Sequence, residues 1–319
     1  MEPDAKISLV RQVLGALQHS AGDLLGALFQ FGEHIDMTTL DRARPLPGYF
    51  PSHWPVECGG NRRQKAASGG LNARDASPVV TTRISDRWNV MVVKREEGAF
   101  YVGGTMPAFA GPPPYGWLER IDVTSLEPVA QSPQLPCGDH VWCGAIAVHE
   151  SGDIIKVNGS FMHRLDQDCR VVCERELPVD RAHNGLLVLS DGSIVTKDLR
   201  LEGQGGSSVT RMSPDGLEVM GEPLQLPEGS MGRIASDLTD DGEFIYVPGI
   251  ERIWRIRVDS DRMVIDHEWN PIYRDEGGEQ GLAWDGCISD GNLWVMDDGD
   301  IDSVRAIFSR HPNGRFEVP

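Results

Sequence analysis

Short runs of apolar residues recur along most of this chain, and many of them are followed by a polar turn that ends in glycine. In five places such a run leads into the turn, and a second apolar run follows at once. Glycine adopts positive φ without strain, so this pattern predicts a tight hairpin at each turn. The turn glycines stand 54, 40, 50 and 49 residues apart, and they are Gly98, Gly152, Gly192, Gly242 and Gly291.

Each copy continues with a third apolar run in the same phase. Four of these runs begin and end with an apolar residue and have Arg in third place: 118–121, 162–165, 209–212 and 253–256. The fifth run, 304–307, has Ala306 in place of the arginine, and a fourth, outer strand is expected over 174–177. Repeats of 40–54 residues with four short strands each predict an all-β fold, the β-propeller. We expect the repeated arginines to pair with carboxylates and so brace neighbouring blades.

The number of blades follows from the need to close the ring. Propellers are usually closed by strands from both ends of the chain, and 79–84 and 315–318 are the candidates. Six blades is therefore the expected count, with five clear copies plus the closure. Because the sequence ends soon after the fifth copy, a piece of a longer propeller protein stays an alternative.

The two segments before the repeats have a different character. Residues 1–38 carry apolar positions at helical spacing, which predicts a helical extension that packs on the main domain. This extension lacks the basic polar face of an interfacial helix, so membrane contact is not expected. Residues 39–77 are rich in Pro, Gly, Arg and Asn and predict a long ordered loop or linker, followed by the propeller domain over 78–319.

The net charge and the cysteines of the chain limit which kinds of partner and which cellular compartment we expect. The formal net charge of −18 disfavours binding to phosphate backbones, so we expect no nucleic-acid partner and either a small-molecule substrate or a protein partner. No basic stretch precedes the first apolar positions, so no secretory signal is expected. The six cysteines have no zinc-knuckle spacing, which favours reduced thiols in a cytoplasmic protein.

Two stretches resemble a known group of propellers. His183 to Gly192 resembles the Asn-Gly-Leu…Asp-Gly strand and turn of the SMP-30/gluconolactonase/strictosidine synthase-like six-bladed propellers. Gln280 to Trp284, followed by Asp290 to Val295, is similar to the same element and also to NHL repeats. The resemblance covers the blade region, about two-thirds of the chain, and its motifs are short.

The resemblance implies one divalent cation, most often Ca²⁺, held at the innermost strands by Glu, Asn and Asp. This ion would polarise a carbonyl or phosphoryl oxygen of the substrate. Asn184 matches the Asn before Gly-Leu in the family. In the fifth copy Gln280 stands at the corresponding place, and Glu279 beside it is the second candidate ligand. The implied activity is that of a small-molecule hydrolase, lactonase-like or esterase-like, or of a lyase.

Position in the repeat selects the candidate site residues. Propeller ligands bind at the mouth of the central channel, where the inner strands of several blades begin. In this interpretation His140 or His183 is the general base, because a histidine titrates near neutral pH. Arg233 binds an anionic group of the substrate, and the remaining polar residues at this phase contact the substrate: Asp139 and Gln280. The alternative is that all these side chains bind loop backbones and one another.

Two functions of different classes follow. The first is a hydrolase or lyase of the gluconolactonase-like type at the channel mouth, which predicts that His140, His183, Asn184 and Glu279 converge. The second is a non-catalytic propeller that binds a protein or ligand, as NHL-like propellers do. This second function predicts an exposed apolar or aromatic patch on a rim.

Overall fold

The computed structural model describes residues 47–65, 80–85, 87–106, 113–140, 144–274, 282–289 and 291–297. The predicted helical extension, the third run at 304–307 and the closing run at 315–318 lie outside these residues. Within them the regular structure is almost entirely β, with one 3₁₀ turn, η1, over Glu57–Gly59. No helix in the described part of the chain is long and apolar enough to cross a membrane.

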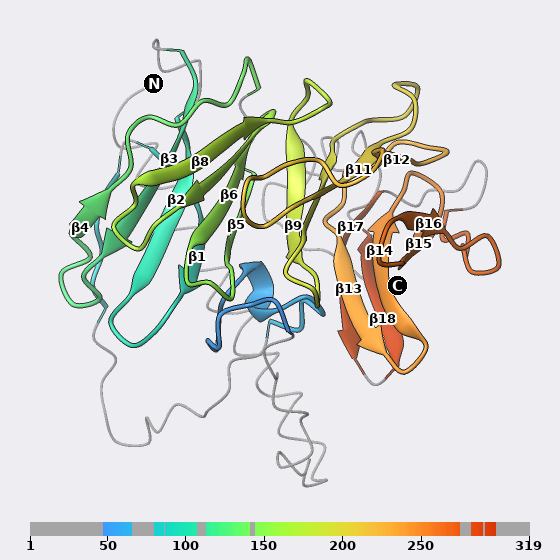
Figure 1. Cartoon of the computed structure of the whole chain (residues 1–319), viewed down its shortest axis with the longest axis horizontal. Coiled ribbons are helices and arrows are strands. Elements are labelled where there is room, and N and C mark those ends of the chain that lie inside the picture. Colours follow the sequence, from blue (N-terminus) through green and yellow to red (C-terminus); the bar gives the residue numbers. More distant parts are fainter. Residues whose placement is uncertain are drawn as a thin grey trace, which may run out of the picture. The chain divides into compact units, whose positions relative to one another are not determined.

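The strands form five antiparallel sheets in chain order (Figure 1). Sheet 1 holds β1 (Trp88–Lys94), β2 (Phe100–Met106), β3 (Tyr115–Ile121) and β4 (Pro128–Gln131). Sheet 2 holds β5 (Ala145–Val148), β6 (Ile154–Asn158), β7 (Phe161–Leu165) and β8 (Val171–Glu176). Sheet 3 holds β9 (His183–Val188), β10 (Ile194–Asp198), β11 (Ser208–Met212) and β12 (Leu224–Gln225).

The remaining strands make two further sheets. Sheet 4 holds β13 (Ala235–Thr239), β14 (Gly242–Pro248), β15 (Ile253–Val258) and β16 (Met263–Ile265). Sheet 5, as described, holds β17 (Ala283–Ser289) and β18 (Asn292–Asp297). In the four-stranded sheets each strand pairs with the next one along the chain, which is the meander of a propeller blade.

The predicted hairpins are confirmed. A turn glycine with positive φ lies between the first two strands of every sheet, with φ from 71° at Gly291 to 127° at Gly242. The predicted third runs form β3, β7, β11 and β15, and the outer run near 174 forms β8. The repeat in the sequence is therefore a repeat of the same four-stranded unit.

Neighbouring sheets pack face to face around shared apolar clusters. One cluster joins sheets 1, 2 and 3 through fully buried residues such as Val93, Val148 and Val188. A second joins sheets 3 and 4 through Leu187, Val195 and Ile245. Every residue of β5, β6, β9, β10 and β11 is buried, whereas exposed and half-buried residues alternate along most of β8 at the outer edge.

The irregular segment 47–65 lies near the lower ends of β5 and β9 in Figure 1, and it is hydrogen-bonded to the first strand of each described sheet. The amide of Lys94 in β1 donates to Trp54 O over 2.8 Å, and that of Val148 in β5 donates to Pro55 O over 2.6 Å. The other three strands are bound through the segment's next residues: Asn61 Nδ2 to Val188 O in β9, Ser236 N to Asn61 O in β13, and Ile288 N to Arg62 O in β17. Five first strands that share one short segment are arranged radially around it, as in a propeller.

This segment lies within residues 39–77, for which a long ordered loop or linker is expected. Its described residues form no sheet of their own and belong to the same compact unit as the sheets. The buried Tyr49 fixes its start, since the Tyr49 hydroxyl accepts the amide of Val188 over 2.7 Å and donates to Asn61 Oδ1. The channel of the propeller is thus filled by the chain's own backbone along part of its length.

The closing strand predicted over 79–84 is wrong for its described residues. Residues 80–85 form no strand, and Val80 and Ile84 are 79% and 98% exposed. Polar anchoring holds this stretch instead, because Arg83 donates to the buried carboxylate of Glu119 in β3 over 2.6 Å and Arg87 donates to the same carboxylate. The apolar side chains that suggested a strand therefore find no sheet face to cover.

Three of the four repeated arginines brace neighbouring sheets, so the prediction is confirmed for these three. Each of the three reaches the loop between the third and fourth strands of the next sheet. The contacts are Arg120 to the Asp168 carboxylate at 3.4 Å, Arg164 to Pro214 O at 2.8 Å and Arg211 to Asp259 O at 2.8 Å. Arg255 pairs within its own sheet with Asp266 at 2.6 Å. An arginine at the same position of the third strand therefore joins its sheet to the next one in three of the four cases.

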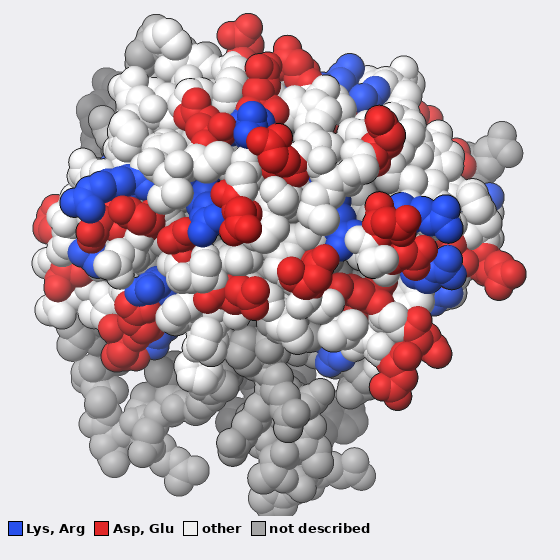
Figure 2. All heavy atoms as spheres, in the orientation of Figure 1, with Lys and Arg blue, Asp and Glu red and all other residues white. Residues whose placement is uncertain are grey.

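Charged side chains of both signs are interspersed on the face of the molecule in Figure 2. Acidic side chains are prominent there, in keeping with the formal net charge of −18. On this face the Lys and Arg side chains lie beside Asp and Glu rather than in a patch of their own.

Two buried histidines make stability depend on pH. Burial lowers the pKa of His163 to about 3, helped by the nearby Lys156, and lowers that of His183 to about 4. Because the unfolded chain binds these protons first, stability is full above the ordinary histidine pKa and falls as pH drops from about 6.5.

We expect His163→Leu to reduce the slope of unfolding free energy against pH by about 1.4 kcal/mol per pH unit between pH 6 and 4.5. Urea titrations at several pH values measure this slope. His267→Leu, at an exposed ring, is the matched control and should leave it unchanged. An unaltered slope in His163→Leu would contradict the assignment.

Candidate functional site

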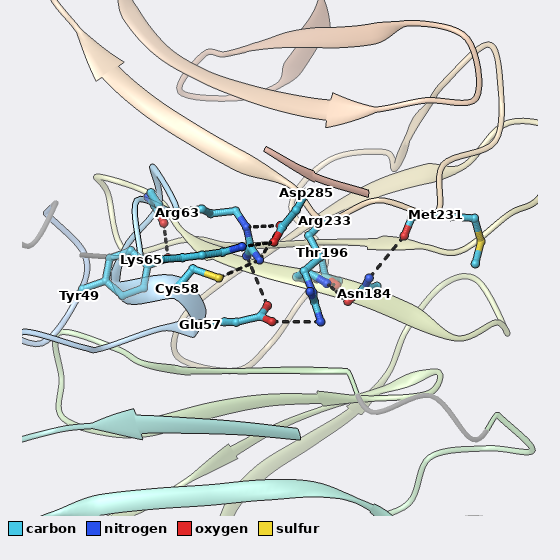
Figure 3. Close-up of polar contacts among 12 residues, drawn as sticks. Tyr49, Glu57, Cys58, Arg63, Lys65, Asn184, Thr196, Met231, Arg233 and Asp285 are labelled. Carbon is cyan, nitrogen blue, oxygen red and sulfur yellow. Dashed lines mark hydrogen bonds and ion pairs between the residues drawn. The ribbon is translucent and has the colours of Figure 1, made fainter. Parts of the chain in front are cut away.

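Charged side chains gather where segment 47–65 meets the first strands of sheets 4 and 5 (Figure 3). We call these residues the channel cluster: Glu57, Cys58, Arg63, Lys65, Arg233 and Asp285. Four come from the central segment, Asp285 from β17, and Arg233 from the loop that leads into β13. The Arg233 amide donates to Trp284 O over 2.8 Å, which fixes that loop against β17.

The ion pairs of the channel cluster form one connected network. Arg63, which is only 3% exposed, binds Asp285 at 2.8 Å and Glu57 at 3.3 Å. The other oxygen of Glu57 binds Arg233 at 3.1 Å, and Lys65 binds Asp285 at 2.8 Å. A buried guanidinium shared by two carboxylates is costly to remove, because both partners would be left unpaired away from water.

Cys58 lies inside this network but remains a thiol. Arg63 donates to its Sγ over 3.2 Å, and its backbone has a positive φ of 63°. Burial raises the pKa of the Cys58 thiol despite the nearby Arg63, so the sulfur carries no charge near neutral pH. Strain at a non-glycine residue of this kind is typical of a site that the surrounding structure holds in place.

Asn184, a second residue predicted from the sequence, lies near the loop that carries Arg233 of the channel cluster (Figure 3). Asn184 Nδ2 donates to Met231 O over 3.5 Å, and its Oδ1 accepts the amide of Gly185 over 2.9 Å. Met231 stands two residues before Arg233 in the same loop. The start of β9 and the loop before β13 therefore lie together at this end of the channel.

His183, the first residue of β9, and His140 both lie by the turn at Gly159, whose carbonyl oxygen accepts the amide of His183 over 3.0 Å. His140 Nε2 is 2.9 Å from Asp180 Oδ1, and hydrogen bonds from His140 and Ser160 lower the pKa of Asp180. His183 is fully buried, and its Nδ1 donates to Arg181 O over 2.9 Å. Since burial lowers the pKa of His183 to about 4, this ring is a poor proton acceptor at neutral pH, whereas His140 is half-buried and accessible.

The remaining candidates are exposed or undescribed. Asp139 is exposed, one residue before His140. Gln280 and Glu279 lie outside the described residues, so the convergence of Glu279 with the histidines stays a prediction. Of the predicted metal ligands only Asn184 is described, and the described part of the chain contains no group of three or more His, Cys, Asp or Glu that could hold a metal. The calcium ion stays a prediction.

Most of the channel cluster was missed from sequence. Residues 57–65 have no strand or helix periodicity, so nothing placed them in the channel. Asp285 offered one signal, because a carboxylate within a predicted inner strand is rarely buried without a partner. Its partners come from a segment about 220 residues away, which no local pattern reveals.

Comparisons with known proteins add little about activity. Neither a protein-family profile nor a curated protein sequence matches this chain. Among solved structures, virginiamycin B lyase from Staphylococcus aureus is similar at 12% identity and a TM-score of 0.47, covering 69% of this chain and 66% of the lyase. The chain thus spans slightly less than two thirds of that protein's length.

Two sugar dehydrogenases are also similar. The putative oxidoreductase (glucose dehydrogenase) from Thermus thermophilus is 14% identical with a TM-score of 0.45, covering 76% of this chain and 84% of its own. The soluble aldose sugar dehydrogenase from Escherichia coli is 10% identical with a TM-score of 0.44, covering 71% and 85%. At these values the propeller assignment comes from the sheets themselves, and activity must be argued from the site.

Proposed function

We propose that this chain is a small-molecule hydrolase or lyase that acts at the mouth of the propeller channel, with His140 as its general base. The observation that carries the proposal is the contact of His140 with Asp180 at 2.9 Å, at the end where the first strands of the sheets begin. A carboxylate on one ring nitrogen orients the imidazole and fixes its tautomer, which leaves the other nitrogen to take a proton.

The chemistry needs no other protein group for its proton balance. In hydrolysis, His140 takes a proton from water while the water oxygen bonds to the carbonyl carbon. The bond to the leaving oxygen then breaks, and that oxygen receives the proton from His140. In a lyase reaction the same base removes a proton from carbon, the carbon–oxygen bond at the neighbouring carbon breaks, and a carbon–carbon double bond forms. The leaving oxygen then receives the proton from His140, which restores the neutral imidazole.

Replacing His140 by glutamine is expected to lower kcat about 100-fold or more with little change in KM, because general-base catalysis contributes to the transition state. The probes are p-nitrophenyl acetate and a panel of small esters and lactones, followed by p-nitrophenolate release or a pH indicator. Formation of a double bond is followed by ultraviolet absorbance.

Two variants make this test specific. Asp180→Asn should lower kcat less and shift the pH profile, since it removes only the orienting charge. His267→Gln, at an exposed histidine in the loop after β16, should retain full activity. Full activity in His140→Gln, or no turnover of any panel member by the unaltered protein, counts against the proposal.

A non-catalytic propeller is the second candidate, and exposed side chains on β18 favour it. Trp294 and Met296 lie two residues apart on the same face of this strand and are 64% and 51% exposed. Such side chains are typical of a protein-binding rim. This function predicts that no panel compound is turned over and that none raises the melting temperature.

A further inference from the structure

We propose that the channel cluster binds the carboxylate of a small, singly charged molecule through Arg233 and Lys65. This inference rests on the proposed function, since it names the class of substrate that the mouth of the channel receives. It is drawn from the charge balance of the cluster and from donors that its ion pairs leave unused.

The cluster carries one more positive than negative charge. Three cations, Arg63, Lys65 and Arg233, face two carboxylates, Glu57 and Asp285. The Cys58 thiol does not supply the missing negative charge, because its pKa is raised. On a protein whose formal net charge is −18, a group with a positive excess beside the channel stands out from the rest of the molecule.

Arg233 has hydrogen-bond donors to spare. A guanidinium carries five N–H donors, and among the described residues only Glu57 pairs with this one. Its Nε is buried with no hydrogen-bond partner in the described part of the chain. Because a buried N–H without an acceptor is costly, and because the guanidinium fork matches a carboxylate, Arg233 is suited to a second carboxylate besides Glu57.

Lys65 supplies the second contact. Its side chain is 55% exposed, and the hydrogen bond to Asp285 raises its pKa, so the ammonium stays charged. One of its three N–H groups serves Asp285, which leaves two for a ligand. In Figure 3 the side chain of Lys65 points toward Asp285 and that of Arg233 toward Glu57, so both lie within the channel cluster.

The same charges argue against a phosphate or another multiply charged anion. A single excess positive charge balances one carboxylate, whereas a dianion would be repelled by Glu57 and Asp285. The ligand is therefore expected to carry one carboxylate and to have its reacting bond elsewhere.

Isothermal titration calorimetry at constant ionic strength tests this, with sodium lactate, pyruvate and benzoate as probes. Lactamide and benzamide are the uncharged counterparts, and phosphate is the dianion. We expect at least one carboxylate to bind, its amide to bind at least tenfold more weakly, and phosphate to bind more weakly than the carboxylate. Arg233→Gln should weaken the carboxylate at least tenfold, Arg233→Lys less, and the exposed Arg257→Gln not at all.

Circular dichroism melting confirms that each variant is folded before titration. The inference is overturned if no carboxylate binds, if amide or phosphate binds equally well, or if folded Arg233→Gln and Arg233→Lys both bind like the unaltered protein. Binding without turnover would refute the proposed catalysis and leave this site standing. Turnover of the ester panel with no carboxylate binding would refute this site and leave the proposed catalysis standing.

Discussion

Replacing Arg211 by leucine is expected to lower the free energy of unfolding by about 2–3 kcal/mol, because its buried guanidinium joins two sheets. Its side chain is 3% exposed and donates to the Asp191 carboxylate over 2.5 Å, to Ser193 Oγ over 2.8 Å and to Asp259 O over 2.8 Å. Leucine leaves all three acceptors without this donor, and the Asp259 contact is the one that ties sheet 3 to sheet 4.

Chemical denaturation of the purified variant measures the loss. Arg257→Leu is the matched control, since Arg257 also pairs with Asp259 but its side chain is 51% exposed. An exposed pair of this kind contributes about 0.2–1 kcal/mol. If both variants lose the same free energy of unfolding, the inter-sheet contact of Arg211 stabilises the protein no more than the exposed ion pair of Arg257.

The second large effect has the opposite sign: Lys197→Met is expected to stabilise the protein by about 2–4 kcal/mol at pH 6. Lys197 in β10 is fully buried, and its Nζ donates to Ser230 O over 3.1 Å. Burial lowers the pKa of its ammonium to about 7, so keeping the charge in the folded state costs free energy. Methionine has a similar shape and carries no charge.

The pH dependence distinguishes this cause from better packing. Between about pH 7 and the ordinary lysine pKa of about 10.4 the unfolded chain binds the proton and the folded chain does not. Stability of the unaltered protein therefore rises with pH in this window, and the advantage of Lys197→Met should shrink by about 3 kcal/mol from pH 6 to 9.5. Urea titrations at both pH values measure it, with Lys94→Met on β1 as control. A pH-independent advantage would contradict the assignment.

The blades could be predicted because their causes are local. A glycine with positive φ, as at Gly192 or Gly242, forms a hairpin wherever apolar runs flank it, and the copies reinforce one another. The arginine at 120, 164 and 211 was interpretable for the same reason, since its phase in the third strand repeats. The closing strand at 79–84 was mispredicted because two valines, an isoleucine and two threonines suit a strand only when a sheet face is free to receive them.

The candidate site could be predicted only in part. Asn184, His140 and Arg233 were found because they stand at the start of inner strands, which is a position in the repeat. Glu57, Arg63 and Lys65 were not, because they lie in a segment without periodicity whose partners are far away in the sequence. Local patterns record which face of a strand is buried, but they do not record which segment covers it.

The sequence by itself determined the all-β repeat, its hairpins and the arginine braces, since each depends on a few neighbouring residues and recurs. Only the tertiary structure decided that residues 47–65 enter the channel and bring Arg63 to Asp285. The physical reason is that burying a charge requires a partner in space, and the chain can supply that partner from any distance along its length.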